Sequence, residues 1–157
     1  MDLILWRHSE AEDSLSGNEH PGTDMDRSLT HRGEKQAARM AAWIDRQLPE
    51  GARILVSPAR RCEQTALALG RKYKVRSELG PEANPAQLLE LVQWPASKYP
   101  ILVIGHQPVL GQVIAQLLEL KEAECAVKKG ALWWLRNRDK YGHNQTLVMT
   151  VQSPELL

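Results

Sequence analysis

The stretch Leu3-Ile4-Leu5-Trp6-Arg7-His8 decides the fold, because four apolar residues lead directly into a cation and an imidazole. A run of four residues is too short for a helix and has no polar face, so we expect a buried β-strand. Open α/β sheets bind ligands just outside the carboxyl ends of their strands. The sequence therefore places Arg7 and His8 where a ligand would bind.

Two further apolar runs end in the same kind of residue. They are Ile101 to Ile104, followed by Gly105-His106, and Arg53 to Val56, followed by Ser57-Pro58 with Arg60 and Arg61 just beyond. The carboxyl ends of parallel strands meet at one edge of a sheet, so we expect the two histidines and at least one arginine to surround a common hollow.

Apolar residues at helical spacing separate these runs. We expect helices that begin at Thr30 as N-cap, at Ser57 as N-cap with Pro58 in the first helical position, over 86–94 and over 109–118. A short strand is expected over 73–76, and two strands over 131–135 and 146–151 are joined by a polar turn containing Asn137, Asp139, Gly142 and Asn144. Alternating strands and helices predict a three-layer α/β/α fold, with a mostly parallel sheet and an antiparallel edge hairpin, as a single domain over residues 1–157.

Composition narrows the class of protein. The chain has 157 residues, enough for a core without disulfides or metals, and a net charge of +1, which neither predicts nor excludes nucleic acid binding. Cys62 and Cys125 show no disulfide-framework or metal-site spacing. The first residues lack a basic leader and a long apolar segment. We therefore expect a cytoplasmic protein with no membrane anchor and no nucleic acid partner.

The residues at the strand ends suit phosphoryl chemistry. An arginine guanidinium matches phosphate oxygens in bidentate fashion, and a neutral imidazole can attack phosphorus. His8 is the better candidate nucleophile because it stands beside Arg7, and a protonated His106 would stabilise the transition-state oxygens. This scheme needs no metal and no cofactor. The polar stretch over 9–28 is long for a loop in a compact domain and is expected to be functional or mobile.

Four segments resemble the histidine phosphatase (phosphoglycerate mutase-like) superfamily in order and spacing. They are Arg7-His8 with Glu10-Ala11, Arg27 to Thr30 with Gly33 and Gln36-Ala37, Ser57 to Ala66, and Ile104 to Pro108. The short chain and the Gly-His-Gln-Pro form resemble the SixA-type branch, which removes phosphate from phosphohistidine on phosphorelay or phosphotransfer proteins. The leaving imidazole departs easily, so such a substrate demands less of a general acid than an alkyl phosphate.

The resemblance implies a role for each site residue. His8 would be the nucleophile, Arg7, Arg61 and His106 would hold the phosphoryl oxygens, and Arg61 rather than Arg60 fits the motif spacing. The implied partner is a phosphohistidine-containing protein and the product is phosphate. Glu78 and Glu82 are the candidate general acids, of which we favour Glu82, although neither stands in a diagnostic motif. A phosphohistidine substrate is equally compatible with no dedicated acid.

One departure from the family pattern keeps other functions open. Ser9, which would lie against the substrate, replaces the glycine of the Arg-His-Gly signature and adds a hydroxyl beside the nucleophile. The alternatives are a small-molecule phosphomonoesterase of the same superfamily, a non-catalytic phosphoprotein-binding module disabled by Ser9, and an oxyanion-binding scaffold that uses the Trp133-Trp134 strand.

Other reactive residues have plainer explanations. We expect surface positions for the three remaining histidines, which are His20, His31 and His143. Cys62 lies near the expected site and is either a thiol of lowered pKa or a small residue that fills the helix interface, of which we favour the second. Trp133 and Trp134 should divide between the core and the outside.

Overall fold

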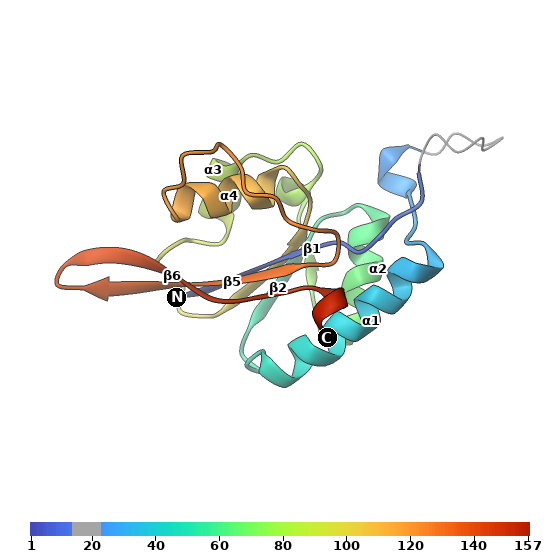
Figure 1. Cartoon of the computed structure of the whole chain (residues 1–157), viewed down its shortest axis with the longest axis horizontal. Helices are drawn as coiled ribbons and strands as arrows, with labels where there is room; N and C mark the ends of the chain where they lie inside the picture. The colour runs from blue at the N-terminus through green and yellow to red at the C-terminus, as the bar shows by residue number, and fades with distance from the viewer. Residues whose placement is uncertain (14–22) are drawn as a thin grey trace.

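A six-stranded sheet forms the centre of the protein in the computed structural model, which describes residues 1–13 and 23–157 (Figure 1). The strands are β1 (Asp2–Arg7), β2 (Arg53–Val56), β3 (Lys74–Val75), β4 (Ile101–Gly105), β5 (Leu132–Lys140) and β6 (His143–Gln152). Their order is β3-β2-β4-β1-β5-β6. The first four are parallel, and β5 and β6 add an antiparallel edge hairpin, which confirms the predicted sheet.

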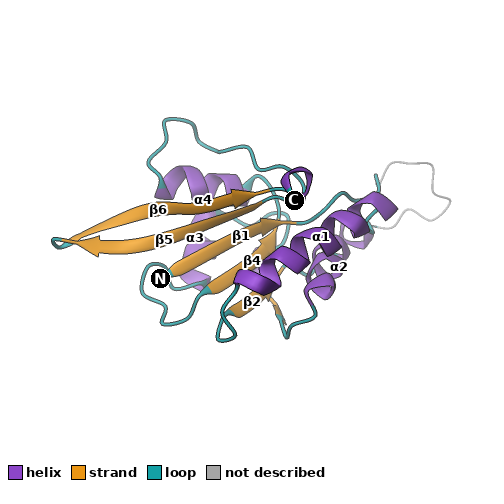
Figure 2. Cartoon of the chain, turned by 60° about the horizontal axis from the view of Figure 1, so that its bottom comes forward, coloured by secondary structure: helices purple, strands orange, loops and turns teal. Residues whose placement is uncertain are grey.

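Helices cover both faces of the sheet (Figure 2). One face carries α1 (His31–Gln47) and α2 (Arg60–Leu69), and the other carries α3 (Pro85–Leu91) and α4 (Val109–Leu117). The short 3₁₀ helices are η1 (Asp24–Asp26), η2 (Ser77–Leu79) and η3 (Pro154–Leu156). The fold is therefore the predicted three-layer α/β/α arrangement.

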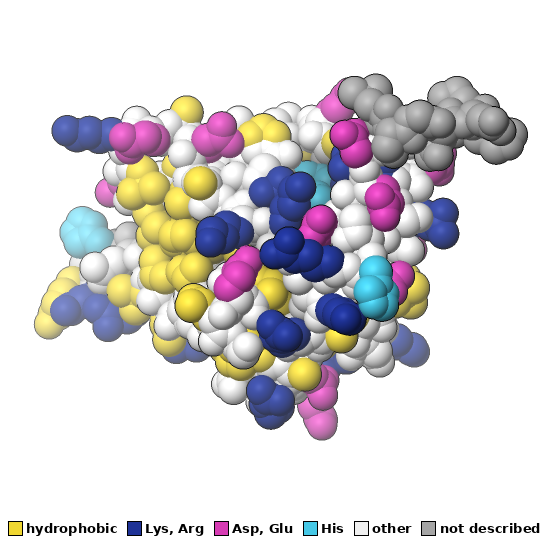
Figure 3. All heavy atoms as spheres, turned by 45° about the vertical axis from the view of Figure 1, so that its right-hand side comes forward, with side chains coloured by type: hydrophobic (Ala, Val, Ile, Leu, Met, Phe, Trp, Pro, Cys, Tyr) yellow, Lys and Arg dark blue, Asp and Glu magenta, His cyan; other side chains and the backbone are white. Residues whose placement is uncertain are grey.

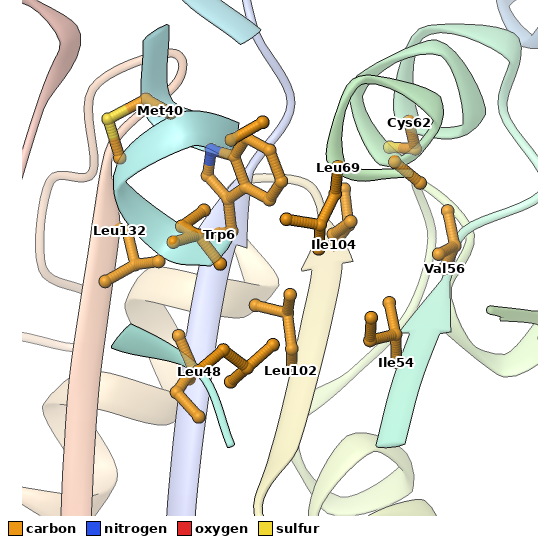
Figure 4. Packing of buried hydrophobic residues seen from close by; sticks show 14 of the residues in the cluster. Trp6, Met40, Leu48, Ile54, Val56, Cys62, Leu69, Leu102, Ile104 and Leu132 are labelled. Atoms are coloured by element: carbon orange, nitrogen blue, oxygen red, sulfur yellow. The ribbon is translucent and has the colours of Figure 1, made fainter. Parts of the chain in front are cut away.

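The alternation of side chains along β1 builds two halves of the core. Ile4 and Trp6 pack with α1 and α2, as Figure 4 shows around Trp6, while Leu3 and Leu5 pack with α3 and α4. All four side chains are fully buried, and each stabilises the fold by about 1.5–3 kcal/mol. Because β1 is packed on both faces, the residues at its end are held in fixed positions.

The segment that follows His8 is clamped to the start of α1. Thr30 is the N-cap as predicted, since its side-chain oxygen accepts a hydrogen bond from the backbone N–H of Gly33 at 2.9 Å. The backbone N–H of Thr30 donates to the carbonyl oxygen of Glu10 at 3.0 Å. A Cβ atom at position 33 would overlap that same carbonyl, so this close approach requires glycine.

The predicted start of α2 is wrong by two residues. The helix begins at Arg60 with Ala59 as N-cap, instead of at Pro58 with Ser57 as N-cap. The Ser57 hydroxyl accepts from the backbone N–H of Ala59 at 3.2 Å and also lies 2.7 Å from Nε2 of His106. Ser57 is thus used by the site, which sequence pattern alone does not reveal.

The edge hairpin is longer than predicted. Its strands continue to a two-residue turn at Tyr141 and Gly142, both with positive φ (53° and 79°), as tight hairpins favour. Asn137, Asp139 and Asn144, predicted to lie in the turn, instead pair across the two strands. The rest of the secondary structure differs by a few residues: the strand expected over 73–76 is Lys74–Val75, and the helices over 86–94 and 109–118 end at Leu91 and Leu117.

The tryptophan pair in β5 does not point to a free surface. Trp134 is buried with the α1 and α2 side of the core, and Trp133 is partly buried against the α3 and α4 side. The expectation of an outward ring is corrected, because both faces of the sheet are covered at this strand.

Candidate active site

The strand ends bring four predicted site residues together. Arg7 ends β1, His8 follows it, His106 follows β4, and Arg61 lies in the first turn of α2 after β2. The rings of His8 and His106 lie 5.3 Å apart, measured between centroids. The parallel pairing of β1 with β4 causes this closeness, since Arg7 is in register with the residue before His106.

His8 is held by both its backbone and its ring. Its N–H donates to the carbonyl of Gly105 at 3.1 Å, and its own carbonyl accepts from the N–H of Gly130 at 2.9 Å. The ring atom Nδ1 lies 2.7 Å from the carbonyl oxygen of Ser9. A carbonyl only accepts, so Nδ1 carries the proton and Nε2 keeps its lone pair.

His106 is oriented by partners at both ring nitrogens. Nδ1 lies 3.3 Å from Nη2 of Arg61, which can only donate, so this nitrogen accepts. Nε2 therefore carries the proton and donates to the Ser57 hydroxyl at 2.7 Å. The thiol of Cys62 lies 3.5 Å from the same nitrogen.

Both imidazoles are neutral in the free protein at neutral pH. Burial is the main cause, and it lowers the pKa of His8 to about 3 and that of His106 to about 4. The charge of Arg61 lowers both values further. The protonated His106 expected to stabilise the transition state is therefore not the form present in the free protein, where its ring nitrogen Nδ1 faces a guanidinium.

Three buried polar atoms at the site have no hydrogen-bond partner among the described residues. They are Nε of Arg7, Nε of Arg61 and the hydroxyl oxygen of Ser9. Nη1 of Arg7 is fixed by the carbonyl of Val127 at 2.7 Å, so its Nε cannot simply turn to solvent. Buried donors normally have partners, and unpartnered ones mark a place where a ligand supplies the acceptors.

Ser9 is packed in the core of the site beside a glycine. Its side chain is fully buried, and its backbone N–H donates to the Thr65 hydroxyl at 3.3 Å. Its neighbour Gly130 has a φ of 79°, and a Cβ there would lie 3.4 Å from the Ser9 hydroxyl and 2.9 Å from Pro154. A glycine at position 130 thus leaves the room that the serine occupies.

Asp24 and Arg27 join the site although sequence reasoning did not single them out. Nη2 of Arg61 donates to Oδ2 of Asp24 at 3.0 Å, and Nη1 donates to its carbonyl oxygen at 2.8 Å. Nη1 of Arg27 donates to Oδ1 at 3.0 Å. Burial acts to raise the pKa of Asp24, but these two arginines outweigh it and lower that pKa. Arg27 belongs to one of the four family-like segments, which was the one available signal.

Glu82 lies at the rim instead of in the buried cluster. It is exposed and lines a cavity of about 690 Å³, together with Asp24, Pro58 and Glu78. Figure 3 shows that charged side chains of both signs cover much of one face of the molecule, beside a gathering of hydrophobic ones. The carboxyl group of Glu82, the candidate general acid, is therefore exposed to solvent.

The remaining reactive residues have plainer roles, although the Cys62 thiol lies beside the ring of His106. Burial raises the pKa of the Cys62 thiol to about 12, so Cys62 fills the helix interface as favoured. His31 and His143 are exposed as expected, and His20 lies outside the described residues. Within residues 1–13 and 23–157, no three His, Cys, Asp or Glu side chains gather into a metal-binding group. In that same part, none of the helices is long and apolar enough to cross a membrane.

Comparisons with known proteins agree on one family. The model of the histidine phosphatase superfamily (branch 1) matches residues 3–84. Phosphohistidine phosphatase SixA of Escherichia coli K12 is 33% identical in an alignment 130 residues long, and the match covers 74% of this chain and 74% of the relative. The structure of the protein histidine phosphatase SixA complexed with tungstate matches with a TM-score of 0.74 and 27% identity, covering 99% of both chains.

A more distant neighbour shares the fold alone. Phosphoserine phosphatase from Entamoeba histolytica, in complex with 3-phosphoglyceric acid, is 19% identical, with a TM-score of 0.70 over 97% of this chain and 96% of its own. The match to the superfamily model spans Arg7, His8 and Arg61 together with helices α1 and α2. The chain therefore belongs to the histidine phosphatase superfamily, as a member of the SixA type.

Proposed function

We propose that this phosphatase is a metal-independent phosphohistidine phosphatase that acts on phosphorylated signalling or phosphotransfer proteins. The observation that carries the proposal is a set of buried donors on Arg7, Arg61 and Ser9 that have no partner within residues 1–13 and 23–157, beside the unprotonated Nε2 of His8. The SixA relative is a phosphohistidine phosphatase, and its counterpart of known structure binds tungstate, a tetrahedral oxyanion like phosphate.

The first step transfers the phosphoryl group to the protein. The Nε2 lone pair of His8 attacks phosphorus, a new nitrogen–phosphorus bond forms, and the bond to the substrate imidazole breaks. The substrate ring takes the electron pair of that bond and leaves as a neutral imidazole when its other nitrogen carries a proton. The hydrogen bond from Nδ1 to the Ser9 carbonyl stabilises the positive charge that develops on His8.

The second step returns the free enzyme. Water attacks the phosphohistidine at position 8, the nitrogen–phosphorus bond breaks, and phosphate is released. Arg7 and Arg61 stabilise the equatorial oxygens in both steps, since each has a buried donor available. A bound phosphoryl dianion favours the cationic form of His106, so we expect its Nδ1 to gain a proton and donate to a phosphoryl oxygen.

The rim favours a protein substrate over small phosphate esters. The cavity beside the site is lined by Glu82 and by the ion-paired carboxylates of Asp24 and Glu78. None of the described residues that line it is a lysine or an arginine, so it offers no cation to the further negative groups that many small phosphometabolites carry. A general acid at the exposed rim is also weakly placed to assist an alkoxide leaving group. The packing of Ser9 against Gly130 argues against a disabled, purely binding module.

Trapping the phosphoenzyme tests this proposal. The protein is incubated with a radiolabelled phosphohistidine protein and quenched, and label on the enzyme should be acid-labile and alkali-stable. His8→Ala should carry no label and lose turnover, while His31→Ala, which replaces an exposed histidine, should behave as wild type. Turnover by the His8→Ala variant would refute the assignment.

The same assay separates the alternatives. We expect kcat/KM for the phosphohistidine protein to exceed that for sugar phosphates by at least about tenfold. A reversed preference would support a small-molecule phosphomonoesterase. Tight phosphoprotein binding with neither label nor turnover would support a non-catalytic binding module.

A further inference from the structure

The carboxylate of Asp24 accepts hydrogen bonds from two guanidinium groups at the entrance to the site. Arg61 Nη2 donates to Oδ2 and Arg27 Nη1 donates to Oδ1, both at 3.0 Å. The Arg61 side chain is only 4% exposed, whereas that of Asp24 is 49% exposed. A buried cation is thus neutralised by a carboxylate that reaches in from the surface.

This contact uses the donors that a phosphoryl group would need. Nη1 and Nη2 of Arg61 both bond to Asp24, and only Nε is left without a partner among the described residues. Carboxylates and phosphates bind to guanidinium groups in the same bidentate manner. The free protein therefore holds an internal anion where the proposed substrate anion would bind.

We propose that Asp24 is an internal competitor of the substrate, and that the phosphoryl group displaces its carboxylate from Arg61. This inference rests on the proposed function, since it assigns Arg61 to the phosphoryl group. The exchange is favourable because a phosphoryl dianion brings more charge than a carboxylate. Its additional oxygens also reach the Nε donors of Arg7 and Arg61, which have no partner in the described part of the chain.

The surroundings of Asp24 allow this exchange. The residue begins η1, a 3₁₀ helix of only three residues, and its side chain also lines the cavity of about 690 Å³. The displaced carboxylate can turn into that cavity, where it is hydrated. Asp26, at the other end of η1, bonds instead to the backbone and hydroxyl of Thr23, so it fixes the turn and does not touch Arg61.

An internal competitor lowers the apparent affinity for every tetrahedral oxyanion. The apparent dissociation constant equals the intrinsic one divided by the fraction of molecules in which Arg61 is uncovered. If about one molecule in five is uncovered, removal of the Asp24 charge tightens binding about fivefold. A residue that merely positions Arg61 would have the opposite effect, because its removal would weaken binding.

Titration calorimetry with inorganic phosphate and with tungstate tests the proposal on the full chain. We expect Asp24→Asn to bind both anions about fivefold more tightly than wild type. Asp26→Asn is the matched control and should bind them as wild type does. Asp24→Ser removes the carboxylate with a smaller side chain and should also bind more tightly, and thermal melting shows that each variant is folded.

Unchanged or weaker binding in folded Asp24→Asn and Asp24→Ser would overturn the inference. This readout needs no turnover, so it is separate from the phosphoenzyme experiment. If no phosphoenzyme forms but the Asp24 variants bind anions more tightly, the proposed function is wrong and the role of Asp24 as an internal competitor is supported. If the phosphoenzyme forms normally but those variants bind anions more weakly, the proposed function is supported and the role of Asp24 as a competitor is wrong.

Discussion

The buried base of the site and its exposed rim differ in burial and in the kind of segment that carries their residues. At the base, His8, His106 and Arg61 are at most 5% exposed, lie at strand ends or on a packed helix, and include donors without partners among the described residues. At the rim, Asp24 and Glu82 are exposed and belong to short or irregular segments. The difference teaches that the sheet holds the buried histidines and Arg61 in place, while the exposed carboxylates, on our proposal, govern what reaches them.

The largest expected effect tests the base through Arg61. Arg61→Lys keeps the charge but loses the planar fork and the buried Nε donor, so we expect kcat/KM to fall by about 10²–10³-fold. Steady-state rates on a phosphohistidine protein measure it. Arg60→Lys is the matched control, since Arg60 is the exposed neighbour on the same helix and should change the rate by less than about twofold. Equal losses in both variants would remove the distinction between a buried base and a solvated helix start.

An intermediate effect concerns stability against pH. The unfolded chain binds protons near pH 6.5, whereas burial lowers the pKa of folded His8 to about 3 and of folded His106 to about 4. The unfolded state therefore binds more protons between pH 6.5 and 4, and the free energy of unfolding falls as the pH falls through this range. Each imidazole contributes about 1.4 kcal/mol per pH unit, or about 2 kcal/mol between pH 6.5 and 5.

Urea titrations at pH 6.5 and pH 5 measure this loss. His8→Asn should reduce it by about 2 kcal/mol, while His31→Asn, at an exposed position, should leave it unchanged. The rim behaves differently, because the lowered pKa of Asp24 keeps its carboxylate charged throughout this range. If the free energy of unfolding depends on pH in the same way in wild type and in His8→Asn, the buried part of the site is more hydrated than the burial of His8 indicates.

The smallest expected effect tests the rim through Glu82. Glu82→Gln should lower kcat on a phosphohistidine protein by less than about threefold, because the imidazole leaving group needs little acid assistance. The same variant should lose more on an aryl or alkyl phosphate if this carboxyl protonates such leaving groups. Glu90→Gln, which replaces an exposed carboxyl on α3, is the control. A large loss on phosphohistidine would move Glu82 from the rim into the reaction.

Much of the fold was predictable because hydrophobic periodicity is a local signal. The runs before His8 and His106 are short, apolar and uninterrupted, and they became adjacent parallel strands. The start of α2 was not predictable from the local pattern, because the Ser57 hydroxyl is bonded to His106, 49 residues away in the sequence. The length of the hairpin depended on a turn at Tyr141 and Gly142, whose left-handed backbone a tyrosine seldom signals.

The candidate site divides in the same way. His8, His106, Arg7 and Arg61 were expected to converge from their places at strand ends, and the structure brings them together. Asp24 was not expected, because its contact with Arg61 depends on how the segment after residue 22 returns to the sheet. The neutral form and the tautomer of His106 in the free protein were not predicted either, since they depend on burial and on which nitrogen faces Arg61.

The backbone of His8 carries a final consequence. The N–H of His8 donates to the carbonyl of Gly105 on one side, and its carbonyl accepts from the N–H of Gly130 on the other. The backbone of His8 is therefore held on both sides. Exposure of this amide to solvent requires the hydrogen bond between His8 and the last residue of β4 to break. Exchange of its amide hydrogen with deuterium should thus proceed as slowly as that of the most protected strands.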